Sequence, residues 1–123
     1  MTRTTHERHL SGISAVGDAA RVDHGSAKAG LTGFTKSLAL RLGRHRITAD
    51  AIAPGFLVSD TTGASARRLG LDFGGYRRSA AQSVPVARVG EPEDIAHTTS
   101  FLVHPEAGFA SGQVVHVAGG PVD

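Results

Sequence analysis

The sequence contains no cysteine and no long hydrophobic run. Without cysteine, the chain cannot form a disulfide framework, a thiolate metal site or a cysteine nucleophile. No stretch of about 18 apolar residues is available for a transmembrane helix, and residues 1–8 have no apolar segment of the kind that marks a signal peptide. These absences favour a cytoplasmic protein that does not act in or on a membrane.

Metal-binding and hydrolytic motifs are also missing. His6 and His9 are three residues apart, whereas the zinc-binding histidines of a metalloprotease helix are four apart with a glutamate between them. His97 and His104 share a helical face, but no third ligand accompanies them. No G-x-S-x-G nucleophile elbow is present for a serine hydrolase. We therefore expect no metal site and no hydrolytic triad.

The charge is slightly basic, with 13 Lys and Arg against 11 Asp and Glu and a net charge of +2. Arginine pairs at residues 67–68 and 77–78 flank a glycine-rich segment, Arg44 and Arg46 follow a predicted helix, and only Tyr76 lies among them as a stacking aromatic. Nucleic-acid binding needs a basic face with stacking platforms or a reading helix. The scattered arginines indicate a solvated surface, and no nucleic-acid partner is expected.

The first half of the chain predicts a helix followed by a strand. From Asp23 to a stop at Gly43, apolar residues recur every three or four positions and so share one helical face. Residues 47–53 are short, apolar and followed by Pro-Gly, which predicts a largely buried strand. Residues 56–75 are glycine-rich without clear periodicity, which predicts a long mobile loop with short helical turns.

The second half repeats this alternation. Residues 76–83 predict a short helix, and residues 91–94, Glu-Pro-Glu-Asp, begin another, with proline in the first turn and carboxylates near the positive helix end. Pro105 ends this helix, and residues 113–118 predict a strand. The alternation predicts one α/β domain with a parallel sheet.

Four segments in order carry a family resemblance: residues 26–39, 47–56, 89–96 and 111–120. They resemble the short-chain dehydrogenase/reductase family, most closely its β-ketoacyl carrier-protein reductase-type members. The resemblance implies a partial Rossmann-like, doubly wound parallel sheet, made from the last two or three strands of the family fold with their helices. Residues 11–123 would then form the C-terminal part of such a domain.

Residues 1–10 would correspond to the family strand that precedes this part. Glu7 and Arg8 put charge where a central parallel strand needs apolar residues on both faces. We therefore expect residues 1–10 to be disordered or to form a degraded strand.

The cofactor expected from the resemblance is NADP or NAD. No G-x-G-x-x-G follows an apolar strand in this sequence, so the family's pyrophosphate and adenine-ribose sites are expected to be absent, and with them the residues that separate NADP from NAD. Pro54, Gly55, Leu57 and Ser59 resemble the segment that holds the nicotinamide amide. Asp50 stands where the family usually has an asparagine, and a carboxylate there costs stability unless it is paired. Binding of a nucleotide by this chain alone is not expected from the sequence.

The family's catalytic pattern is Tyr-x-x-x-Lys with a serine about a dozen residues earlier. By resemblance, Lys28 takes the place of the lysine, which also contacts the cofactor, and His24 stands in place of the tyrosine. The serine corresponds to Ser11, or to Ser14 if the intervening loop is shorter. An imidazole can transfer a proton near neutral pH, but its ring ends short of a phenol oxygen, and a general acid must first reach its acceptor. We expect a severe loss of reductase activity.

Three functional hypotheses follow. The chain is an impaired NAD(P)-dependent ketoreductase or alcohol dehydrogenase relative acting on a small carbonyl or alcohol; or a non-catalytic module that binds itself or a full-length family member; or a non-redox catalyst that uses the pocket near His24. A sheet of few strands with an unpaired edge buries little surface. We therefore expect a homo-oligomer, a dimer or larger.

Overall fold

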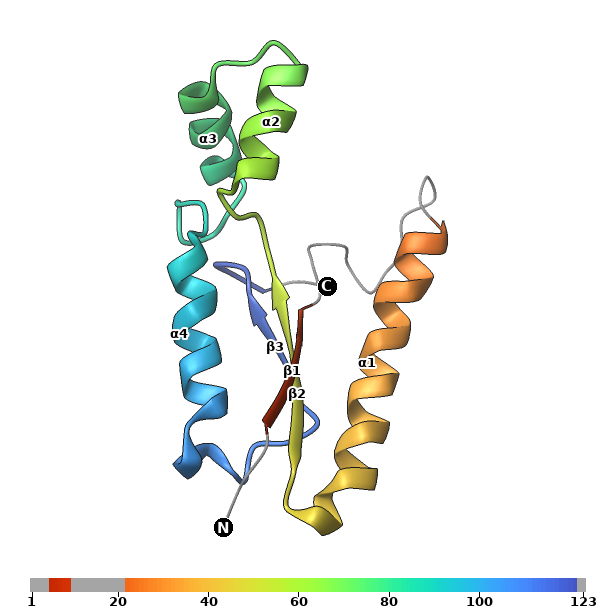
Figure 1. The fold of residues 1–123 in the computed structure, drawn as a ribbon. Helices are drawn as coiled ribbons and strands as arrows, with labels where there is room; N and C mark the ends of the chain where they lie inside the picture. Colours follow the sequence, from red (N-terminus) through yellow and green to blue (C-terminus); the bar gives the residue numbers. More distant parts are fainter. Residues whose placement is uncertain (1–4, 10–21, 122–123) are drawn as a thin grey trace.

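The computed structural model of the chain describes residues 5–9 and 22–121 (Figure 1). Three strands form one parallel sheet in the order β1-β2-β3. The strands are β1 (Thr5–His9), β2 (Thr48–Pro54) and β3 (Val114–Val117). The helices are α1 (Val22–Leu42), α2 (Asp60–Arg68), α3 (Phe73–Gln82) and α4 (Pro92–Val103), with short 3₁₀ helices η1 (Gly43–His45) and η2 (Pro105–Ala107). This confirms the partial doubly wound α/β fold.

The central strand β2 organises the core. All seven of its residues are buried, and α1 and α4 cover its two opposite faces (Figure 1). On the α1 side, Ala51 and Ala53 pack with Leu31 and Val114. On the α4 side lies the larger cluster: Ile52, Ile95 and Leu102, with Leu57, Val115 and Val117. Successive residues of a strand point to opposite faces, so β2 contributes Ala51 and Ala53 to one cluster and Ile52 to the other.

Helix α1 ends close to its predicted boundary. Leu42 is its last residue, and the chain continues through η1 to Arg46, which has a left-handed backbone (φ 59°) and donates its N–H to Gly43 O at 2.9 Å. A left-handed residue that closes the last turn is a common helix stop. The predicted helix and the strand that follows it are therefore confirmed.

A strand does form near the start of the chain. β1 pairs with β2 in parallel, with Thr5 opposite Thr48 and His9 opposite Ile52. Of the two expectations for residues 1–10, a disordered segment or a degraded strand, the structure has a strand at Thr5–His9, and the other residues of 1–10 lie outside the described part. Strand pairing uses main-chain groups, and edge strands tolerate charged residues that a central strand would not.

Residues 56–75 contain ordered helix, and the prediction of a long loop is wrong. Ser59 begins α2: its N–H donates to Thr62 Oγ1 at 2.7 Å and its Oγ accepts from Thr62 N at 3.3 Å. Asp72 begins α3 by accepting from Gly75 N at 2.9 Å. Such caps satisfy N–H groups that have no partner within the helix, and they outweigh the helix-weakening effect of the glycines. The short helix predicted over residues 76–83 begins earlier, at Phe73.

Helix α4 begins with proline at its first turn and ends before Pro105, as its sequence predicts. Asp94 closes the first turn by accepting from Glu91 N at 2.8 Å. Across residues 5–9 and 22–121, no helix is both long and apolar enough to cross a bilayer.

Candidate functional site

The candidate site lies where β2 ends. The carboxyl end of β2 and the amino-terminal end of α1 are at the same end of the sheet, and α2 and α3 stand beyond it (Figure 1). In open parallel sheets, ligands bind outside the carboxyl ends of the strands. The segment from Pro54 to Ser59 leaves the sheet at this position.

The main-chain N–H and C=O of Leu57 point away from Gly90, the residue beside it in the structure. It forms an isolated parallel bridge with Gly90, in which Phe56 O accepts from Gly90 N at 3.0 Å and Val58 N donates to Gly90 O at 2.9 Å. Because trans peptides place C=O and the next N–H on opposite sides, the N–H and C=O of Leu57 point away from Gly90. Neither group has a hydrogen-bond partner in the described part of the chain. One donor and one acceptor are thus presented side by side.

Two glycines allow this arrangement. A Cβ on Gly55 would lie 2.7 Å from Cα and 2.8 Å from Cβ of Ala118, and Gly55 N donates to Val117 O at 3.0 Å. A Cβ on Gly90 would meet the Leu57 side chain and would lie 3.2 Å from Phe56 O. The backbone can take its path past β3 and residue 90 only because both positions lack a side chain.

The hydroxyl of Ser59 is partly engaged. Its oxygen accepts from Thr62 N, so its hydrogen remains available for donation. Ser59 therefore both starts α2 and offers one donor two residues after Leu57.

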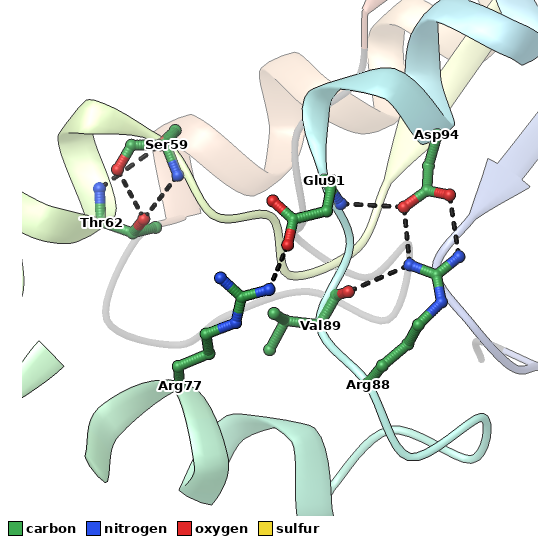
Figure 2. Close-up of polar contacts among 7 residues, drawn as sticks. All are labelled: Ser59, Thr62, Arg77, Arg88, Val89, Glu91 and Asp94. Carbon is green, nitrogen blue, oxygen red and sulfur yellow. Dashed lines mark hydrogen bonds and ion pairs between the residues drawn. The ribbon is translucent and has the colours of Figure 1, made fainter. Parts of the chain in front are cut away.

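Two ion pairs surround the start of α4 (Figure 2). Arg77 of α3 contacts Glu91 through Nη2 and Oε1. Arg88 binds Asp94 with two hydrogen bonds, Nη1 to Oδ2 at 2.7 Å and Nη2 to Oδ1 at 2.8 Å, and donates to Val89 O at 3.1 Å. The ring of Tyr76 meets that of Phe56 edge-on, with centroids 5.6 Å apart. These contacts join α3, residues 88–91 and the segment that carries Leu57.

The Arg88–Asp94 pair changes the titration of both groups. The hydrogen bond from Arg88, helped by the N–H of Glu91, holds the pKa of Asp94 well below its usual range, and the same bond raises the pKa of Arg88. The pKa of an unfolded-state aspartate is about 3.9. Since the folded-state pKa is lower, the stabilisation is complete above that value and is lost as pH falls toward the folded-state pKa.

We expect Asp94→Asn to lower the melting temperature at neutral pH, because the variant keeps an acceptor for Glu91 N but loses the charge that binds Arg88. The difference in melting temperature between the variant and the wild type should become smaller as pH falls below about 4, where the wild-type carboxylate begins to protonate. Thermal melts across the acid range measure this. Glu93→Gln removes a charge from the same helical turn without removing the pair, so it is the matched control. A difference that stays constant through the acid range would contradict the prediction.

The catalytic residues suggested by the resemblance are only partly described. His24 and Lys28 belong to the first turns of α1, one helical turn apart. This end of α1 lies at the same end of the sheet as the carboxyl end of β2 (Figure 1), and the side chains of the two residues lie outside the description. Ser11 and its alternative, Ser14, fall outside the described residues. The roles of all four remain predictions.

Asp50 is buried, with 1% of its surface exposed. Its Oδ1 accepts from Gln113 N at 2.9 Å, whereas Oδ2 is buried without a hydrogen-bond partner in the described structure. The sequence indicates a stability cost unless this carboxylate is paired, and the structure pairs only one of its two oxygens. The bond to Gln113 holds the chain that leads into β3 against β2.

Two features of the site were missed from the sequence. In the sequence Gly90 stands out only as part of the segment 89–96, whereas in the structure its main chain fixes the direction of Leu57. The scattered arginines of the sequence suggest that Arg77 is solvated, whereas in the structure it contacts Glu91. The separation of 14 residues between Arg77 and Glu91 carries no local signal. The described residues contain no group of three or more side chains that could hold a metal ion.

Comparison with known proteins gives consistent results. The family model described as enoyl-(acyl carrier protein) reductase matches residues 9–121. The chain is 42% identical over 122 residues to the short-chain reductase protein NovJ of Streptomyces niveus, covering 98% of this chain and 47% of that protein. It is 39% identical over 108 residues to the 3-oxoacyl-(acyl-carrier-protein) reductase FabG of Staphylococcus aureus, covering 88% of this chain and 41% of that protein.

A solved structure with the same fold is L-sorbose reductase from Gluconobacter frateurii, complexed with NADPH and L-sorbose. The TM-score is 0.83 at 26% identity, and the match covers 96% of this chain and 47% of that one. The chain therefore spans less than half the length of these relatives. On the sequence match, the shared fold and the family model, the chain belongs to the short-chain dehydrogenase/reductase family.

Proposed function

We propose that this chain provides the nicotinamide-facing part of an NAD(P)-dependent ketone reductase or alcohol dehydrogenase, with impaired activity when it acts alone. The observation that carries the proposal is the pair of free main-chain groups on Leu57 at the carboxyl end of β2. A nicotinamide carboxamide has one carbonyl acceptor and one amino donor, which match the N–H and C=O of Leu57. The donor left on Ser59 fits the same polar ligand.

The substrate class is proposed as a ketone. The names of two relatives point this way, since L-sorbose is a ketose and a 3-oxoacyl group carries a ketone. When bound, a reduced nicotinamide supplies a hydride to a carbonyl carbon. His24 would hold the proton for the carbonyl oxygen, with Lys28 one helical turn away in α1. A shorter imidazole in place of a phenol leaves that proton farther from its acceptor, so impaired turnover is expected.

The test is a titration of the 123-residue chain with NADPH, NADH and reduced nicotinamide mononucleotide, with the oligomeric state measured in the same buffer. If the chain contributes only the nicotinamide side, the mononucleotide should bind about as well as either dinucleotide. Ser59→Ala should weaken binding by about 2- to 12-fold, the loss of one hydrogen bond. Thr62→Ala also weakens the start of α2 but removes no proposed ligand contact, so it should leave affinity nearly unchanged. Absence of saturable binding by a folded protein would overturn the proposal.

A second candidate is an association module for the chain itself or for a full-length family member. It is supported by an apolar hollow of about 550 Å³ between the end of α4 and residues 106–110. On its rim, Phe109 is fully exposed and Phe101 is 62% exposed. Exposed apolar patches of this kind often mark protein contacts. A stable dimer or tetramer without nucleotide binding would favour this candidate.

A further inference from the structure

We infer that the Arg77–Glu91 ion pair is a positioning contact. By fixing α2 and α3 against the start of α4, it helps hold the N–H and C=O of Leu57 in the direction that a ligand would meet. The inference rests on the proposed function, because it concerns the same nicotinamide-facing segment. Arg77 does not itself offer a group to a ligand in this scheme. It acts through residues 90–91 and the bridge to Leu57.

The first step concerns how α2 and α3, together called the lobe, are joined to the rest of the described chain. The two helices pack on each other and stand beyond the end of the sheet (Figure 1). In the described part of the chain, the ion pair of Arg78 stays within this lobe, on Asp72 at 4.0 Å, and the pair of Arg88 joins residues outside it. Arg77–Glu91 joins the lobe to the start of α4, so this ion pair is placed to fix the lobe.

The second step leads from Glu91 to Leu57. Glu91 directly follows Gly90, whose N–H and C=O hold Phe56 O and Val58 N. Glu91 N is itself held by Asp94 Oδ2 at 2.8 Å, and Asp94 is held by Arg88 (Figure 2). The Arg77–Glu91 ion pair therefore acts on the main chain of residues 90–91. That main chain is bonded to α4 on one side and to residues 56–58 on the other.

The third step closes the path through α3. Tyr76, next to Arg77, places its ring against Phe56, the residue before Leu57. The lobe thus reaches the site segment by two routes, a ring contact at Phe56 and an ion pair through residue 91. Without the ion pair, the ring contact at Phe56 and the chain connection through Ser59 remain, and the bridge at Leu57 should open more often.

The experiment is residue-resolved amide hydrogen exchange on the nucleotide-free chain. Arg77→Gln should raise the exchange rates of the Val58 and Gly90 amides by about two- to fivefold, the size expected from losing an ion pair whose side chains are 46% and 36% exposed. Glu91→Gln should have the same effect, and the double variant should add nothing further. Arg77→Lys keeps the charge and should retain most of the protection. The amide of Gly55, bonded to Val117 O outside the bridge, should be unchanged.

Arg78→Gln is the matched control, because it removes the adjacent arginine, whose ion pair stays within the lobe. Equal exchange in Arg77→Gln and wild type would overturn the inference. So would a rise that Gly55 shares, since that would indicate a general loss of stability. The measurement needs no nucleotide, so it stands apart from the binding titration: faster exchange without nucleotide binding would sink the proposed function and leave the positioning contact in place.

Discussion

Replacing Gly55 by alanine should destabilise the chain by about 1–3 kcal/mol, the usual cost of forcing extra volume into a packed site. The new methyl group would lie 2.7 Å from the Cα of Ala118, which is backbone and cannot rotate away. Relief requires β2 and the end of β3 to separate, and that movement would displace Leu57. We therefore expect both a lower melting temperature and a loss of any nicotinamide binding.

The measurement is chemical denaturation of the Gly55→Ala variant, with nucleotide titration of the same preparation. Gly63→Ala is the matched control, because Gly63 lies within α2 and a Cβ there meets nothing within 4 Å. The Gly63→Ala substitution should stabilise α2 by about 0.5–1 kcal/mol. If the free energy of unfolding changes in the same direction in both variants, the close approach of Gly55 to Ala118 is not the reason for the effect at residue 55.

Asp50→Asn should raise the free energy of unfolding, because a buried group without a partner costs more as a carboxylate than as a neutral amide. The asparagine keeps an oxygen that can accept from Gln113 N, so the link between β2 and β3 is retained. It replaces the unpartnered Oδ2 of the carboxyl group by an amide nitrogen, and burial of an amide costs less than burial of a carboxylate. Denaturant unfolding of the two proteins measures the difference.

Asp72→Asn is the control for this substitution. Asp72 is exposed and begins α3 through one hydrogen bond to Gly75 N, and asparagine starts helices about as well as aspartate. Its free energy of unfolding should therefore stay close to the wild-type value. An Asp50→Asn variant that is no more stable than wild type would contradict the prediction.

The central strand and the helix that follows residue 91 were predictable because local patterns coincide with burial. Residues 47–53 are apolar and end in Pro-Gly, and β2 is buried along its whole length. Pro92 and Asp94 mark the start of α4 in the sequence and occupy its first turn in the structure. In both elements the local signal and the packing agree.

Helix α2 was not predictable in the same way. Its glycine and small polar residues give no periodic apolar face, and its start depends on a reciprocal bond between Ser59 and Thr62. A threonine in the place usually taken by Glu or Gln makes the start signal weaker. The bridge between Leu57 and Gly90 is even harder to predict from local sequence, because it joins two segments that are far apart in the chain.

The bond between Asp50 and Gln113 spans 63 positions of sequence, and this spacing has a consequence for synthesis. At about 5–20 residues per second, a ribosome needs roughly 3–13 s to add the residues between β2 and the strand that covers its edge. During that interval the nascent chain carries an apolar strand with an open row of peptide groups. We expect β2 to be a binding site for chaperones while the chain is being made. Its open edge should close only when β3 has been synthesised and pairs with it.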